Sequence, residues 1–217
     1  MSNTSLVWKK LLMALSGIAL VGFLVLHLSG NLLIYLGPKA INAYAERLEG
    51  LGPILWVMRI GLIAIAVLHI YTAICLTRRN RQARPRAYAM QKQIQSNMAS
   101  RTMALSGLVV LSFVCYHLAH LTFRWTHAQA FAGLDEDDVY SMLILSFSSP
   151  WVSSFYCVSI VLLMTHLSHG ISSFFQTLGL NHSKSYPIIR KAGPTLSLGL
   201  ALGFLSIPVS IFFGLIK

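Results

Sequence analysis

Five long, continuously apolar stretches constrain this 217-residue chain more than any other feature of its sequence. Each has about twenty residues or more, the length that a helix rising about 1.5 Å per residue needs to cross about 30 Å of hydrocarbon. A closed β-barrel would instead show short alternating segments separated by turns. The sequence therefore predicts an all-α membrane protein of one domain, residues 1–217. Its transmembrane helices are expected at about Leu11–Leu36, Ile54–Thr77, Met103–Phe123, Trp151–Gln176 and Thr195–Ile216.

The composition excludes an ordinary soluble protein, because 55% of the residues are hydrophobic and only 11% are charged. Cys75, Cys115 and Cys157 all fall inside apolar stretches and show no C-x-x-C spacing. We expect small core residues at these positions, not a disulfide framework or ligands of an iron–sulfur cluster.

The positive charges predict how the chain is oriented in the membrane. Twelve Lys and Arg residues lie before the first helix or in the segments after the second and fourth, against four on the opposite side. Cytoplasmic loops retain positive charge, so the N-terminus is predicted to be cytoplasmic. This bias explains most of the net charge of +11, which also suits attraction to anionic headgroups or an acidic partner. A nucleic-acid partner is not needed to explain the basic composition. The twelve are Lys9, Lys10, Arg78, Arg79, Arg81, Arg84, Arg86, Lys92, Arg101, Lys184, Arg190 and Lys191.

An internal repeat relates the helices in pairs. The segment MALSGIALVGFLVLHL, which contains His27, matches MALSGLVVLSFVCYHL, which contains His117, at eight of sixteen positions. The two histidines therefore lie at the same height on helices that enter from the same side. The second and fourth helices show a weaker relation, since His69 and His166 each follow an entrance proline by sixteen residues. This pattern predicts a parallel repeat of two helix pairs.

The histidine heights follow from counting along each helix. Sixteen residues with a tilt of about 20° correspond to roughly 23 Å of a core about 30 Å thick. Counted from their entrances, His27 and His117 then lie near the outer surface, and His69 and His166 near the inner one. We expect the two pairs to be about 15 Å apart along the membrane normal.

Four ionisable side chains at matched depths in a membrane indicate a function, although one buried histidine alone is usually a packing residue. A neutral imidazole can ligate haem iron, and a pair from opposing helices occupies both axial positions. The sequence therefore predicts two electron-transferring b-type haems. His27 and His117 would hold the outer haem, and His69 and His166 the inner haem.

Further residues are candidates for contacts with these haems. Gly17 and Gly107 precede the outer histidines by ten residues, at the level of the other haem, where a missing side chain would admit the macrocycle. His120 and His169 follow predicted ligands by one turn, and each either hydrogen-bonds a propionate or packs. Arg59 either extends to the membrane surface or neutralises a propionate.

Six segments spread over nearly the whole chain resemble those of a known family. They are HLSGNL at 27–32, NAYAERLEGLGPILW at 42–56, NRQARPRAY at 80–88, YHLAHLTFRW at 116–125, DVYSMLILSF at 138–147 and HLSHGISSFFQTLGLN at 166–181. The chain resembles the five-helix, dihaem cytochrome b558 membrane-anchor subunit of bacterial succinate:quinone oxidoreductases and fumarate reductases. The last segment together with the A-R-P segment is the most specific.

The resemblance implies a membrane anchor of succinate dehydrogenase or fumarate reductase, respiratory complex II, in the bacterial cytoplasmic (inner) membrane. Such a subunit holds a flavoprotein subunit and an iron–sulfur subunit, and relays electrons between their clusters and a quinone, usually menaquinone. FAD and the iron–sulfur clusters belong to those partners, so this chain is not expected to oxidise succinate itself. The family's four axial ligands map onto His27, His69, His117 and His166.

Quinone chemistry also needs a group that transfers protons near a haem and near water. Glu49 is our candidate at the outer haem, and Glu46 a weaker one, because both are expected on a short loop before the second helix. Ordinary solvation of the two carboxylates is the alternative. A quinone site on the inner face, beside the iron–sulfur subunit, is the other possible location.

Two other functions agree with the same histidines. One is a haem-b anchor of another respiratory dehydrogenase, such as hydrogenase or formate dehydrogenase, and the other is a haem-free transporter with a histidine proton relay. The acidic stretch at 135–138 is predicted to be a solvated loop or the start of a helix. Docking of the soluble subunits is expected on the inner face, at Arg78–Arg101 and Asn181–Lys191.

Overall fold

The computed structural model describes residues 3–82, 103–180 and 186–217, and within these ranges it is helical with no β-strand. Five of its helices are long and apolar enough to cross a membrane, which confirms the predicted all-α class and the number of spans. A 3-10 turn, Leu32–Leu36, extends the first, and a π-helical turn, Leu118–Thr122, extends the third. The five are α1 (Asn3–Asn31), α3 (Pro53–Gln82), α5 (Met103–His117), α7 (Pro150–Thr177) and α8 (Tyr186–Phe212).

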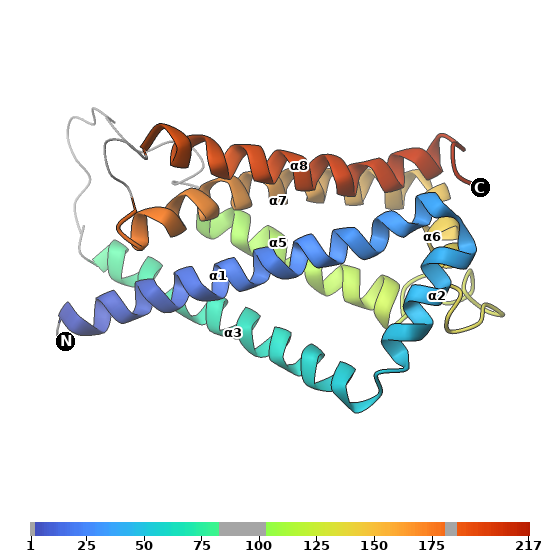
Figure 1. Ribbon diagram of the computed structural model, residues 1–217, viewed down its shortest axis with the longest axis horizontal. Coiled ribbons are helices and arrows are strands. Elements are labelled where there is room, and N and C mark those ends of the chain that lie inside the picture. The colour runs from blue at the N-terminus through green and yellow to red at the C-terminus, as the bar shows by residue number, and fades with distance from the viewer. Residues whose placement is uncertain (1–2, 83–102, 181–185) are drawn as a thin grey trace.

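Two shorter helices, α2 (Pro38–Glu49) and α6 (Val139–Ser148), lie at the end of the bundle that holds the C-terminus (Figure 1). A glycine–proline pair starts α2, because Gly37 adopts a φ of 90° and Pro38 takes the first helical position. The expectation of a short loop at Glu46 and Glu49 is therefore wrong, since both belong to α2. A search for long apolar stretches does not detect a polar helix of twelve residues.

Asp138 starts α6 and also joins it to α2. Its side chain accepts hydrogen bonds from the backbone N–H of Ser141, at 3.1 Å, and from the Asn42 amide, at 3.0 Å. The Asn42 oxygen in turn accepts from the backbone N–H of Tyr140, at 2.9 Å. Of the two alternatives for the acidic stretch, a helix start is confirmed at Asp138.

Three helix boundaries differ most from the prediction. Helix α1 begins at Asn3 instead of Leu11, α3 continues to Gln82 instead of ending at Thr77, and α8 begins at Tyr186 instead of Thr195, with Pro194 inside it. In each place the helix extends beyond the apolar stretch into a segment with polar residues. Hydropathy defines the part of a helix that lipid covers, whereas backbone hydrogen bonding continues into the headgroup region.

The long helices pack as two antiparallel pairs joined through α7. Helix α1 packs on α3 and α5 packs on α7, while α7 also contacts α1 and makes the most extensive interface with α8. In Figure 1, α3 diverges from α1 towards the end of the bundle that holds α2. Two clusters of buried side chains hold α7 and α8 to their neighbours. One contains Ile34, Ile41, Leu143, Phe147, Val152, Tyr156, Ile207 and Ile211, and the other Val21, Leu28, Leu167, Ile171 and Leu200.

All four tryptophans are exposed near the ends of long helices. Trp8 lies near the start of α1, at one end of the bundle, and is 63% exposed. Trp56, Trp125 and Trp151 lie at the opposite end and are 61%, 73% and 85% exposed. Tryptophan is enriched at membrane–water interfaces, so this distribution agrees with a bundle that spans the membrane along its long axis.

Candidate functional site

The predicted outer pair, His27 and His117, meets between α1 and the last residue of α5. The two imidazole rings have centroids 5.8 Å apart and planes at 89° to each other. Two imidazoles that bind opposite faces of one metal through bonds of about 2 Å have centroids about 6 Å apart. The observed separation is therefore close to the spacing that axial ligation requires, and the repeat's prediction of equal heights agrees with it.

Aromatic side chains surround the outer pair. Phe23 stacks on His27 with centroids 5.3 Å apart, and Phe204 of α8 lies 6.0 Å from the same ring. Phe113 lies one turn before His117 at 5.9 Å. These rings give the outer pair an apolar environment in which a flat, apolar group can pack.

The hydroxyl of Tyr156 on α7 lies within hydrogen-bond distance of two histidines, one at the end of α5 and one in the π-helical turn that follows α5. This hydroxyl lies 3.0 Å from Nδ1 of His120 and 3.4 Å from Nδ1 of His117. His120 is fully buried, stacks on Phe131 with centroids 5.8 Å apart, and has no hydrogen-bond partner for Nε2 among the described residues. The π-helical turn carries His120, and such turns are frequent at functional sites.

The predicted inner pair is His69 of α3 and His166 of α7, and each ring is held by a serine of another helix. Ser16 Oγ lies 3.1 Å from Nδ1 of His69, and Ser106 Oγ lies 3.1 Å from Nδ1 of His166. Both serines belong to the repeated M-A-L-S-G segment, but neither was predicted to be a site residue.

The two glycines of the same segment face these rings. A Cβ atom added at Gly17 would lie 3.2 Å from Cε1 of His69, and one added at Gly107 would lie 3.4 Å from Cε1 of His166. The glycines therefore give the imidazoles of the inner pair room to lie close to α1 and α5. The predicted contact of Gly17 and Gly107 with a haem macrocycle stays a prediction.

Several charged side chains lie at the end of the bundle opposite the inner pair, where α2 meets α3. Glu49 ends α2 and is exposed, while Arg59 lies in the first two turns of α3 with its guanidinium 5.2 Å from the Trp56 ring centroid. A hydrogen bond that protonated Glu49 donates to the Asp137 side chain, together with partial burial and nearby negative charge, raises the pKa of Glu49, and Arg59 opposes this rise. By contrast, Ser141 and Asn42 lower the pKa of Asp138. Asp137 was not predicted to be a partner of Glu49.

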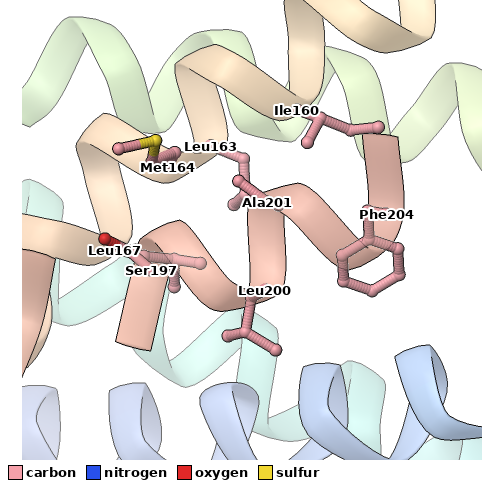
Figure 2. Close-up of a pocket in the computed structure, with 8 residues that line it drawn as sticks. All are labelled: Ile160, Leu163, Met164, Leu167, Ser197, Leu200, Ala201 and Phe204. Carbon is pink, nitrogen blue, oxygen red and sulfur yellow. The ribbon is translucent and has the colours of Figure 1, made fainter. Parts of the chain in front are cut away.

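Other possible sites in the described ranges are weaker. Residues 3–82, 103–180 and 186–217 contain no group of three or more His, Cys, Asp or Glu side chains that could hold a free metal ion. A small hollow between α7 and α8 is lined almost entirely by apolar side chains, with Ser197 as the exception (Figure 2). The Ser197 hydroxyl already donates to the backbone oxygen of Pro194 at 3.1 Å. The two histidine pairs are therefore the stronger candidates for chemistry.

Comparison with known proteins supports the functional assignment at the level of the family. The family described as succinate dehydrogenase/fumarate reductase transmembrane subunit matches residues 77–204. No curated protein and no solved structure matches the chain. The matched region runs from the end of α3 to the middle of α8 and contains His117 and His166, one member of each histidine pair.

Proposed function

Since the chain belongs to the family of succinate dehydrogenase/fumarate reductase transmembrane subunits, we propose that it binds two b-type haems and carries electrons between an iron–sulfur subunit and a quinone. Its soluble partners are then the flavoprotein and iron–sulfur subunits of that complex, in a bacterial inner membrane. The family match favours this assignment over a hydrogenase or formate dehydrogenase anchor.

The close approach of His27 and His117 is the observation that carries the haem assignment. The 5.8 Å between the ring centroids of His27 and His117 suits two axial ligands of one iron. His69 and His166 are held through Nδ1, which leaves Nε2 as the nitrogen that can bind a metal. Haem b, when bound by two histidines, supplies a one-electron centre with no open position for oxygen.

A reduced-minus-oxidised absorption spectrum of the purified membrane protein tests this proposal. We expect a b-type α band and two haems per chain, measured against protein concentration. A chain that contains no haem after expression with ample haem supply would reject the assignment and would favour a transporter with a histidine relay.

We place the quinone reaction at the outer end of the bundle, with Glu49 as the proton-transfer group and menaquinone as the expected quinone. A raised pKa makes a carboxyl group a better proton donor near neutral pH, and the Glu49 side chain is exposed to the solvent that must supply protons. Arg59 is close enough to Glu49 to affect its charge, so the two residues belong to one site.

The variant Glu49→Gln tests the quinone site, with Glu46→Gln as its matched control on the same helix. We expect Glu49→Gln to lose quinone-linked turnover while both haem spectra and activity toward an artificial acceptor at the soluble subunits are retained. Glu46→Gln should keep the quinone-linked turnover, both haem spectra and the activity toward the artificial acceptor. Unchanged quinone turnover in Glu49→Gln would reject this residue and would favour a site beside the iron–sulfur subunit.

A further inference from the structure

Ser16 and Ser106 are related by the internal repeat and contact the two inner histidines in the same way. Ser16 reaches from α1 to His69 of α3, and Ser106 reaches from α5 to His166 of α7, each with 3.1 Å between Oγ and Nδ1. The sequence separations are 53 and 60 residues. Two equivalent contacts made by independent helix pairs indicate that the contact has a purpose beyond local packing.

The serine hydroxyls are already committed as donors to their own helices. Ser16 Oγ lies 2.7 Å from the backbone oxygen of Leu12 and 3.1 Å from that of Met13, and Ser106 Oγ lies 3.1 Å from the backbone oxygen of Met103. A carbonyl oxygen can only accept, so each hydroxyl proton points to the backbone. With the hydroxyl proton given to the backbone, the serine oxygen is the acceptor for the imidazole, and Nδ1 of each histidine carries the proton.

We propose that Ser16 and Ser106 are positioning residues that fix the inner histidines as Nδ1–H tautomers, with the Nε2 lone pairs directed away from the serines and available to bind haem iron. This inference rests on the proposed haem function. Hydrogen bonds from the second nitrogen of a ligating histidine fix its tautomer and ring orientation and raise its basicity. Gly17 and Gly107 support the same arrangement, because each follows its serine and lets the imidazole approach the helix.

The outer pair lacks this arrangement in the part of the chain that the structure describes. There, His117 is 3.4 Å from the Tyr156 hydroxyl, which also lies 3.0 Å from His120. The serines therefore act on one haem site only, and the other site provides an internal reference within the same molecule.

The test compares Ser16→Ala and Ser106→Ala with Ser29→Ala and Ser112→Ala in the intact, haem-loaded complex. Ser29 of α1 and Ser112 of α5 are suitable controls, because they donate to backbone oxygens of Val25 and Leu108 at 2.8 and 3.0 Å. The readouts are the midpoint potential and the electron paramagnetic resonance g values of each haem. The inner haem is identified as the one lost in His69→Ala.

In Ser16→Ala and Ser106→Ala we expect the midpoint potential of the inner haem to rise, because a less basic imidazole stabilises the oxidised iron less. Its g values should shift as the ring orientation is released, and haem release from this site should become roughly tenfold faster or more. The outer haem should keep its potential and spectrum, which also shows that the variant is folded. Both control variants should match the wild type.

A second readout does not depend on the haem. Nitrogen-15 spectra of the haem-free chain should show His69 and His166 protonated at Nδ1 in the wild type, and a mixture of tautomers for the affected ring in each serine variant. Unchanged inner-haem potentials and g values in both serine variants would overturn the positioning role. If the wild type holds no haem, the proposed function fails instead, so the two failures are distinguishable.

Discussion

In the proposed assignment each haem takes one ligand from each half of the internal repeat, so each histidine variant should affect one haem only. We expect His27→Ala and His117→Ala to remove the outer haem, and His69→Ala and His166→Ala to remove the inner haem. The number of haems per chain measures the loss, and the component that disappears from the split α band shows which haem was lost. Removal of both haems by every variant, or of neither, would contradict the pairing.

The neighbouring histidines serve as matched controls for that experiment. His120→Ala and His169→Ala should leave both irons six-coordinate. His120 is fully buried and bonded to Tyr156, so its variant is also expected to unfold at a lower temperature. Loss of a haem in His120→Ala without loss of thermal stability would make His120, not His117, the ligand on α5.

Asp137 provides a test of the environment of Glu49. The Asp137 hydrogen bond is the largest cause of the raised pKa of Glu49, so Asp137→Asn should lower that pKa towards its ordinary value. The pH profile of quinone-linked turnover should therefore move to lower pH. Asp135→Asn is the control, because Asp135 does not contribute to this shift. A profile that stays in place in Asp137→Asn would separate Glu49 from the proton-transfer step.

At the scale of elements, the close packing of α7 and α8 depends on Gly193. A Cβ atom at this position would overlap the backbone oxygen of Ser168 and the Ser172 hydroxyl. Gly193→Ala should therefore destabilise the fold by about 1–3 kcal/mol, measured as a lower unfolding temperature in detergent. Gly199→Ala on the same helix should be neutral or slightly stabilising, because nothing lies within 4 Å of its added Cβ. Equal unfolding temperatures of the two variants would contradict this account.

The long helices and the close approach of His27 and His117 were predictable from the sequence, because lipid imposes both a length on helices and a cost on polar residues. Helices α2 and α6 were not, since α2 is polar and α6, although apolar, is too short to stand out as a membrane span. The repeated M-A-L-S-G segment marked Gly17 and Gly107 as important, but not what faces them. The side chains that face the glycines are set by the packing of α1 on α3 and of α5 on α7. This packing brings together residues that are 53 and 60 positions apart in the sequence.

For the whole molecule, the distribution of charge between the two ends predicts where the partners bind. Lys9 and Lys10 near the start of α1, the arginines at the end of α3, and Arg190 and Lys191 at the start of α8 share one end, as the helix directions in Figure 1 show. The remaining topogenic charges, Arg84, Arg86, Lys92, Arg101 and Lys184, lie outside the described residues, as do parts of both predicted docking segments.

Neutralising Arg190 and Lys191 to glutamine should weaken assembly with the soluble subunits, because both side chains are exposed at that end. Co-purification of the flavoprotein and iron–sulfur subunits measures the loss, after membrane insertion has been checked. Lys39→Gln at the opposite end is the control and should assemble normally. Crosslinks from the soluble subunits to Asp135–Asp138 would instead show that the predicted orientation is inverted.

The internal repeat has a consequence for the ancestry of such a chain. One half carries one histidine of each pair, on α1 and α3, and the other half carries the second histidine, on α5 and α7. Neither half alone completes a proposed site, whereas two identical halves related by a two-fold axis would complete both at once. An origin by duplication and fusion of a self-associating two-helix ancestor would therefore keep both proposed sites working throughout. Such a fusion would free the halves to diverge: Tyr156 stands where the first half has Arg59, and α8 has no counterpart there.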